Sequence, residues 1–344
     1  MIRFDCDYLE GAHPLIIEKL CKTNLEQTLG YGDDPYCERA ANLIKKACNA
    51  PESDVHFLVG GTQTNTTVIS AILRPHQAVI SASTGHINVH ESGAIEATGH
   101  KVIALPSPDG KLTAKAVEEC CSSHWNDPCH EHMVQPGMIY ISQPTECGTT
   151  YTKRELQKLY GICKEFKIPL YIDGARLGYA LASEGCDMVL SDVASNCDVF
   201  YIGGTKVGAL FGEAVVINNN EIKKDFRYII KQKGGLLAKG RLLGIQFETL
   251  FENDLYLKIS EHAIKEAKQI KEIFVSHGCD FLSDSKTNQQ FPIMKNQEIE
   301  KLLKDFSFEI WCPISENKSA VRFCSSWATT DENIKALETA VKNL

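Results

Sequence analysis

The sequence predicts an α/β protein in which a mostly parallel sheet is sandwiched by helices and a smaller α/β domain follows. Helical stretches such as residues 153–166 lie between short apolar runs. Strands that alternate with helices along a chain form parallel sheets covered by helices. The apolar runs, rich in β-branched residues and typical of buried strands, are residues 79–81, 102–105, 138–141, 170–172 and 199–202.

The C-terminal third of the chain has a different pattern. A long amphipathic helix is predicted for residues 255–277, and strand-like segments follow at residues 291–293 and 319–324, before a final helix from Thr330. We therefore predict that residues 1–245 form an N-terminal arm and a large domain, and that residues 246–344 form a small domain.

Composition limits the partners and the compartment. The chain has 344 residues, 43% of them hydrophobic, which is enough for a large core. A formal net charge of −8 argues against a nucleic-acid partner. The first residues lack the apolar core of a signal peptide and no run approaches the length of a membrane span, so we expect no membrane association. Fourteen cysteines without a repeating framework indicate reduced thiols, and we expect a cytoplasmic protein.

One lysine directly follows a predicted buried strand. Lys206 comes after residues 199–202 and a Gly-Gly-Thr turn, and the apolar residues 207–211 follow it. Burial disfavours the ammonium form, and a lysine with a lowered pKa can attack a carbonyl, as a Schiff base with pyridoxal phosphate (PLP) requires. The alternative is a glycine-rich turn whose lysine reaches out to water.

An acidic residue ends another predicted strand. Asp173 follows residues 170–172 and precedes Gly174, Ala175 and Arg176. The carboxyl ends of parallel strands face one crevice, so Asp173 and Lys206 can meet there. A carboxylate at that point can keep the pyridine nitrogen of PLP protonated, which makes the ring an electron sink. Taken alone, the same residues are also compatible with an ordinary turn.

A glycine pair offers a site for a phosphate. Residues 55–59 run as a strand into Gly60, Gly61 and Thr62, and residues 64–73 have helical spacing. Free backbone N–H groups at a helix start favour an anion. The segment matches neither a Walker loop nor a dinucleotide fingerprint, and such turns also join strands to helices without any ligand.

A set of short motifs occurs in one order along the chain, and with them the chain resembles the threonine aldolase and β-eliminating lyase family of fold-type I PLP enzymes. The similarity runs from Asp5 to the C-terminus. The motifs are Tyr31-Gly32-Asp33-Asp34, Gly60-Gly61-Thr62-Gln63-Thr64-Asn65, Gly85-His86-Ile87-Asn88 with Glu91 and Gly93, Ser142-Gln143-Pro144-Thr145-Glu146, Asp173-Gly174-Ala175-Arg176, Gly204-Thr205-Lys206 and Val321-Arg322-Phe323.

The resemblance implies PLP as the cofactor and gives each matched residue a role. Lys206 would bind the cofactor covalently, Asp173 would hold the ring nitrogen, and His86 would stack on the ring. These three would be the catalytic residues. The residues implied to hold the phosphate are Gly61, Thr62 and Thr205, and those implied to grip the substrate α-carboxylate are Arg176 and Arg322.

The implied reaction is that of a low-specificity L-threonine aldolase: cleavage of a β-hydroxy-α-amino acid, of the threonine or allo-threonine type, to glycine and an aldehyde. His86, Glu91 or a water remain open as the base, and we favour His86 acting through a water. The alternatives are another PLP reaction, such as β-elimination, transamination or decarboxylation, and a non-catalytic protein that keeps the fold. The family also implies a homodimer or homotetramer with active sites near the subunit interface.

Some positions depart from the commoner family members. Val59 precedes Gly60 where a serine is more usual, and residues 230–235 carry two separate lysines rather than an Arg-Lys pair. We expect Lys231 or Lys233 to reach a phosphate, without deciding which of the two does so or in which subunit.

Several residues have a structural reading beside the functional one. His86 is also compatible with a core or helix-capping histidine. Arg322 lies in an apolar strand and needs an anionic partner, which is either the substrate or an internal acid, and Arg176 faces the same choice. The Cys- and His-rich residues 120–132 lack a paired ligand spacing, so we predict a solvated loop and no metal.

Overall fold

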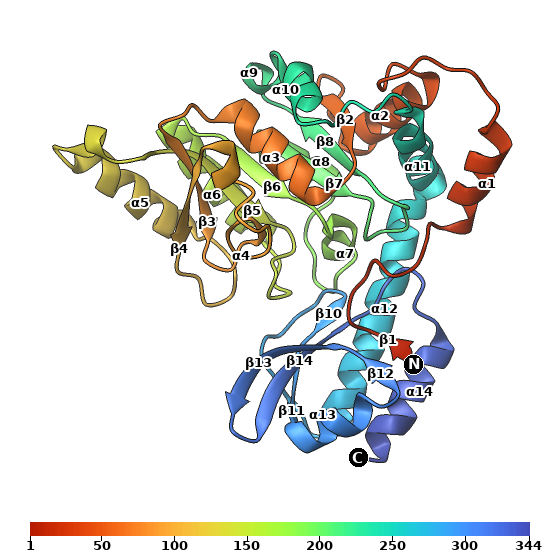
Figure 1. Ribbon diagram of the computed structural model, residues 1–344. Coiled ribbons are helices and arrows are strands. Elements are labelled where there is room, and N and C mark those ends of the chain that lie inside the picture. Colours follow the sequence, from red (N-terminus) through yellow and green to blue (C-terminus); the bar gives the residue numbers. More distant parts are fainter.

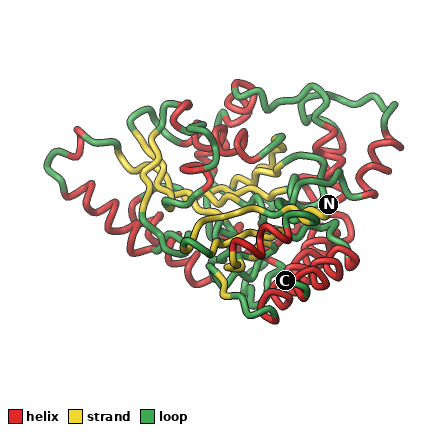
Figure 2. The backbone as a smooth tube through the Cα atoms, turned by 60° about the horizontal axis from the view of Figure 1, so that its bottom comes forward, coloured by secondary structure: helices red, strands yellow, loops and turns green.

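The computed structural model describes all residues from Met1 to Leu344. Figure 1 shows a large α/β part and, below it, a smaller part that holds both chain ends. Seen from below, the strands run through the middle of the molecule and helices flank them (Figure 2).

Seven strands form the central sheet in the order β2-β8-β7-β6-β5-β3-β4. Neighbouring strands are parallel, except that β8 is antiparallel to both β2 and β7. The predicted fold class, a mostly parallel sheet with helices, is therefore confirmed. The strands are β2 (Asp54–Leu58), β3 (Gln77–Ala82), β4 (Lys101–Leu105), β5 (Gln135–Ser142), β6 (Leu170–Asp173), β7 (Val199–Gly203) and β8 (Glu213–Ile217).

Helices cover both faces of this sheet. Alternate strand residues point to opposite faces: Tyr140 and Tyr201 pack toward α3, whereas Ile139 and Phe200 pack on the other side. The helices of the large part are α1 (Pro14–Thr23), α2 (Pro35–Ala47), α3 (Gly61–Ile72), α4 (His86–Val89), η1 (Glu96–Thr98), α5 (Ala114–Asn126), η2 (His130–His132), α6 (Lys153–Phe166), α7 (Leu177–Leu181), α8 (Leu190–Ser195), α9 (Asn220–Lys223), α10 (Phe226–Gln232), α11 (Arg241–Phe251) and η3 (Glu252–Asp254).

The long helix α12 (Leu255–Ser276) connects the large part to the small one (Figure 1). In the small part, β10 (Gln289–Gln290), β14 (Lys318–Cys324), β11 (Pro292–Lys295) and β9 (Asp280–Phe281) form an antiparallel sheet, and β13 (Glu309–Ser315) pairs with β14. The helices α13 (Asn296–Leu302) and α14 (Asp331–Lys342) complete it.

The N-terminal strand lies in the small part, in a separate two-stranded sheet. β1 (Ile2–Arg3) pairs in parallel with β12 (Phe306–Ser307), and Phe4 lies in the small hydrophobic core. The predicted division at residue 245 falls inside α11, and it stays a prediction. The chain thus begins in the small part and crosses to the large one near residue 7. None of the helices combines the length and the hydrophobicity that a bilayer crossing requires.

The predicted elements and the observed ones agree in most places. The five predicted apolar runs and the predicted strand at residues 55–59 lie in the central sheet, and the helix predicted for residues 153–166 is α6. The strands predicted at residues 291–293 and 319–324 correspond to β11 and β14 of the small part. Strand β8 was not predicted. Its antiparallel direction means that it enters the sheet from the ligand side, which strand-and-helix alternation in the sequence does not reveal.

Candidate active site

A cavity of about 300 Å³ opens where the carboxyl ends of the parallel strands meet. It is lined by residues that follow β2, end β5 and β6 and follow β7. Of the predicted site residues, the structure brings Gly61, Thr62, His86, Asp173, Arg176, Thr205 and Lys206 to this lining, and it leaves Arg322 outside.

Lys206 sits in the turn after β7. The hydroxyl of Tyr179 donates to its backbone oxygen at 2.5 Å, and its Nζ atom lies 5.9 Å from the ring centre of Tyr8. Removal from water lowers the pKa of the Lys206 ammonium group, and Arg176 lowers it further, against the opposing effect of Asp7 and Asp173. The lysine is therefore suited to act as an amine nucleophile.

Asp173 is held in place by four donors. Its Oδ2 accepts from the hydroxyl of Tyr140 at 2.6 Å and from Asn65 Nδ2 at 3.2 Å. Its Oδ1 accepts from the hydroxyl of Tyr201 and from the backbone N–H of Ala175 at 3.0 Å. Burial and the Asp173 charge raise the pKa of both tyrosine hydroxyls, which keeps them protonated as donors. The carboxylate is therefore fixed in orientation before any ligand binds.

His86 begins the short helix α4 and is oriented by an acid. Its Nδ1 lies 2.8 Å from Glu91 Oε1, which also accepts from Asn65 Nδ2 at 2.7 Å. Burial lowers the pKa of the His86 imidazole, but the hydrogen bond that its Nδ1 donates to Glu91 and the charge of Asp173 outweigh burial, so the pKa is raised. With Nδ1 engaged by Glu91, Nε2 is the ring atom left to exchange a proton. Glu91 Oε2 is buried in the cavity wall without a partner.

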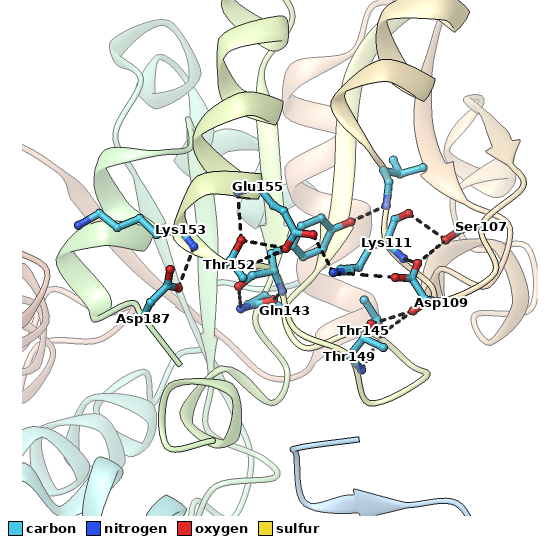
Figure 3. Close-up of polar contacts among 12 residues, drawn as sticks. Ser107, Asp109, Lys111, Gln143, Thr145, Thr149, Thr152, Lys153, Glu155 and Asp187 are labelled. Carbon is cyan, nitrogen blue, oxygen red and sulfur yellow. Dashed lines mark hydrogen bonds and ion pairs between the residues drawn. The ribbon is translucent and has the colours of Figure 1, made fainter. Parts of the chain in front are cut away.

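The loop between β5 and α6 fixes a second acid beside His86. Glu146 Oε1 accepts from the His86 backbone N–H at 3.0 Å and from the Ser142 hydroxyl at 2.7 Å. Figure 3 shows how the loop is held: Gln143 pairs with the backbone of Tyr151, and the hydroxyl of Thr149 donates to the backbone oxygen of Asp109 at 2.7 Å. These contacts make the loop a rigid support for Glu146.

The predicted phosphate site lies at the start of α3. Gly60 precedes the helix and no side chain caps it, so the first backbone N–H groups are free for an anion. A Cβ atom on Gly61 would lie 3.2 Å from the hydroxyl of Tyr201, so a larger residue would press on that tyrosine. Thr205 faces this site from the turn after β7, but its hydroxyl donates to Glu213 Oε1 at 2.9 Å.

The two arginines have different partners. Arg176 makes a two-point ion pair with the buried Asp7, at 2.6 Å from Nε and 2.9 Å from the terminal nitrogen. Arg322, on β14, pairs with the half-exposed Glu309, and its guanidinium lies 5.1 Å from the ring centre of Trp311. The Nε atom of Arg322 is buried without a partner. Internal acids, the structural alternative for both arginines, are thus present.

The remaining candidates lie away from the cavity. Lys231 Nζ is 4.8 Å from the ring centre of Tyr31, and neither Lys231 nor Lys233 lines the cavity. The solvated loop predicted for residues 120–132 is wrong, because they form the end of α5, η2 and the turn between them, and Cys121 and His124 lie on the buried face of α5. The structure gathers no group of three or more His, Cys, Asp or Glu side chains able to hold a metal ion.

Sequence reasoning missed Tyr140, Tyr201, Asn65, Glu213 and Asp7. A signal for the two tyrosines was present, because Tyr140 lies two residues before the end of β5 and Tyr201 two before the end of β7. Side chains two apart on a strand share a face. No comparable signal marks Asp7, because its partner Arg176 is remote in sequence.

The donors suit PLP. Free helix N–H groups for a phosphate, a fixed carboxylate at a strand end and a lysine of lowered pKa line one cavity. Fold and site together define a PLP-dependent enzyme of fold type I.

Comparison with known proteins gives the family. The chain belongs to the family described as "Beta-eliminating lyase", whose sequence model matches residues 11–297. A solved structure of Leishmania major threonine aldolase superimposes with a TM-score of 0.97 at 44% identity, covering 100% of this chain and 99% of that one. A low specificity L-threonine aldolase from a Pseudomonas species is 29% identical over 344 residues, covering 99% of this chain and 97% of its own. A mutant Thermus thermophilus aspartate aminotransferase, at 16% identity, covers 100% of this chain and 92% of its own with a TM-score of 0.73, and shares the fold.

Proposed function

We propose that the protein cleaves a β-hydroxy-α-amino acid of the threonine type to glycine and an aldehyde. The observation that carries this proposal is the placement of Lys206 and Asp173 after the neighbouring parallel strands β7 and β6, within one cavity. Similarity to proteins named threonine aldolase over nearly the whole chain supports the choice of this reaction.

The residues divide the work as follows. Lys206 supplies the amine that holds the cofactor, and Asp173 would hold the ring nitrogen. Bound PLP supplies an electron sink for the electron pair that stays on Cα when the Cα–Cβ bond breaks. His86 takes the proton from the β-hydroxyl group at Nε2, directly or through a water, while Glu91 holds the ring at Nδ1. The β-carbon leaves as an aldehyde, and a proton returned to Cα completes glycine.

We propose that Arg322 binds the substrate carboxylate. Arg176 is paired with the fully buried Asp7. Arg322 pairs with the half-exposed Glu309, its terminal nitrogens also donate to Gln289 Oε1 and to the Asp5 backbone oxygen at 3.2 Å, and its buried Nε has no partner. An arginine fork binds a carboxylate through two donors, and Glu309 is the more exposed member of the pair, so a substrate carboxylate can replace it. In this arrangement Arg176 stays paired with Asp7 and has a structural role in the cavity wall. The contact to the substrate carboxylate then comes from β14 of the small part.

Product analysis tests the function. The purified protein is incubated with L- and D-threonine, both allo-threonines, phenylserine, serine and tyrosine, with Lys206→Ala as the control. We expect acetaldehyde or benzaldehyde in equal amount with glycine, and no product from the variant. Pyruvate and ammonia without glycine would instead identify a β-eliminating enzyme.

We also propose that the protein is a cytoplasmic homo-oligomer. The loop between α1 and α2 lies beside α10, where Arg227 donates to the backbone oxygen of Tyr31 at 3.3 Å. This region exposes Leu25 (91%), Leu29 (71%) and Tyr228 (77%), an apolar surface that a second copy can cover. Light scattering on Leu25→Glu should give a smaller particle than the wild type, and an unchanged mass would show that the subunit contact lies on another surface.

The cysteines support the cytoplasmic location. All fourteen are unpaired, as in a reducing compartment.

A further inference from the structure

A buried acid lines the cavity beside Thr205, one of the residues predicted to hold the phosphate. Glu213 is the first residue of β8, and its neighbours in the sheet are Leu58 at the end of β2 and Gly203 at the end of β7. It is 4% exposed and lines the cavity together with Thr62 and Thr205. No role in the proposed reaction requires an acid at this position.

Glu213 has two donors, and one of them, Thr205, is also assigned to the phosphate. Its Oε1 accepts from the Thr205 hydroxyl at 2.9 Å, and its Oε2 accepts from the backbone N–H of Gly204 at 3.1 Å. An ionised carboxylate therefore competes with a phosphate for the Thr205 hydroxyl. It also repels the phosphate by its charge, which is costly in a buried site.

The groups that face Glu213 disfavour its charge on balance. Burial raises the pKa of the Glu213 carboxyl to about 8, with Asp173 adding to the rise, against the hydrogen bond from Thr205 and the charge of Lys206. The ends of β2 and α3 place no titratable group in the cavity wall. The other ionisable groups whose charge couples to Glu213 are the hydroxyls of Tyr171, Tyr201 and Tyr256.

We propose that Glu213 is a cofactor-binding residue that acts in its protonated form, donating its O–H to the cofactor phosphate, so that ionised Glu213 must take up one proton when the phosphate binds. The proton comes from solvent and remains on the carboxyl group. Thr205 is then free to donate to the phosphate as well, while the carboxyl oxygen still accepts from Gly204. The inference rests on the proposed cofactor site at the start of α3.

The consequence is a cofactor affinity that depends on pH. Below the pKa of Glu213 the acid is already protonated, and its contribution to the affinity is constant. Above it, each pH unit weakens binding about tenfold, because one proton must be supplied. Holoenzyme should therefore lose cofactor in alkaline buffer.

Calorimetry on the apoprotein of the full chain tests this. The probe is pyridoxine 5′-phosphate, which lacks the aldehyde and so does not react with Lys206. Titrations below and above pH 8, in buffers of different ionisation enthalpy, give the affinity and the number of protons taken up. Wild type should approach one proton at alkaline pH. Glu213→Gln, whose amide always donates, should keep the neutral-pH affinity within about threefold and lose the proton uptake.

A matched pair removes the contribution of the lysine. The same titrations are run on Lys206→Ala and on the double variant with Glu213→Gln, so that the ionisation of Lys206 is absent from both. The proposal is wrong if the two proteins show the same pH dependence. If Glu213→Gln does not fold, the infrared spectrum of wild type at alkaline pH decides: a carboxylic-acid carbonyl band must appear on binding the probe. Wild type that does not bind the probe at any pH overturns the cofactor site itself.

Discussion

The orientation of the Asp173 side chain is fixed by its hydrogen bonds. The sheet aligns Tyr140 and Tyr201 on either side of it, and their hydroxyls, with Asn65, leave the carboxylate no other stable orientation. Such fixed charges are effective because they need no reorganisation during the reaction. Both tyrosines are buried, so water is not an alternative hydrogen-bond partner for their hydroxyls.

Asp173→Asn should therefore bind the cofactor yet lose at least about a hundredfold in kcat, since a neutral amide cannot balance a pyridinium charge. Cofactor absorbance and turnover with threonine measure the two effects separately. Tyr140→Phe is the matched control: it removes one donor, keeps the charge and should cost roughly tenfold or less. Full turnover in the Asn variant would separate Asp173 from the ring nitrogen.

The arginine pair allows a similar separation. Arg322→Lys should keep the fold and the cofactor but raise KM for threonine more than about tenfold, because lysine lacks the planar fork. Glu309→Gln removes the internal competitor for Arg322 and should lower KM. Steady-state kinetics on both variants measures this. Unchanged kinetics in Arg322→Lys would leave Arg176 as the carboxylate site.

The turns after β6 and β7 are packed backbone against backbone. A Cβ atom on Gly174 would lie 1.9 Å from the backbone oxygen of Tyr201, and one on Gly203 would lie 2.3 Å from that of Ala175. The two turns carry Asp173 and Lys206, so the glycines set the distance between the two parts of the site. A side chain at either position must push the strand ends apart.

Gly174→Ala should accordingly destabilise the protein by about 2–4 kcal/mol and weaken cofactor binding. Gly161→Ala serves as the control. Gly161 lies in α6 with nothing within 4 Å of the added Cβ, and helix propensity predicts a gain of about 0.5–1 kcal/mol. Denaturant unfolding of the two variants should therefore shift in opposite directions. A Gly174→Ala protein as stable as wild type would show that the turns can yield.

What could be predicted at this level depended on whether the signal was local. The apolar runs of β6 and β7 and the residues that follow them are contiguous, so Asp173 and Lys206 could be placed at one sheet edge from sequence. The position of the acid on β8, Glu213, could not be predicted from the sequence. Glu213 reaches the cavity because β8 runs antiparallel between β2 and β7, and strand direction is a property of the assembled sheet.

The molecule as a whole is tied together by the N-terminal arm. In this arm, which comprises residues 1–7, β1 pairs with β12 in the small part, and Asp7 contacts the large part. Fully buried, Asp7 accepts from Arg176 of the large part and, at 2.8 Å, from Asn288 of the small part. One carboxylate therefore joins the arm and both parts beside Lys206, which explains why sequence reasoning about separate domains overlooked it.

Loss of this carboxylate should be felt by the entire fold. Burial raises the pKa of Asp7, but the charges of Arg176 and Lys206 and the hydrogen bonds to it outweigh burial, so the pKa lies below its usual value of 3.8. A carboxyl group with a depressed pKa stabilises the folded state above its unfolded pKa, and that stabilisation is lost as pH falls through the folded pKa. Asp7→Asn should cost about 3–5 kcal/mol at neutral pH, because it strands the charge of Arg176, and should show a weaker loss of stability below about pH 4 than wild type does. Asp5→Asn is the matched control. Asp5 also has a lowered pKa, but it pairs with the exposed Arg3 at 2.8 Å, and such an ion pair is worth less than about 1 kcal/mol. Denaturant unfolding at neutral and acidic pH measures the stability of both variants. Equal stability of the two variants at neutral pH would show that the arm is an appendage and that the two parts hold together without it.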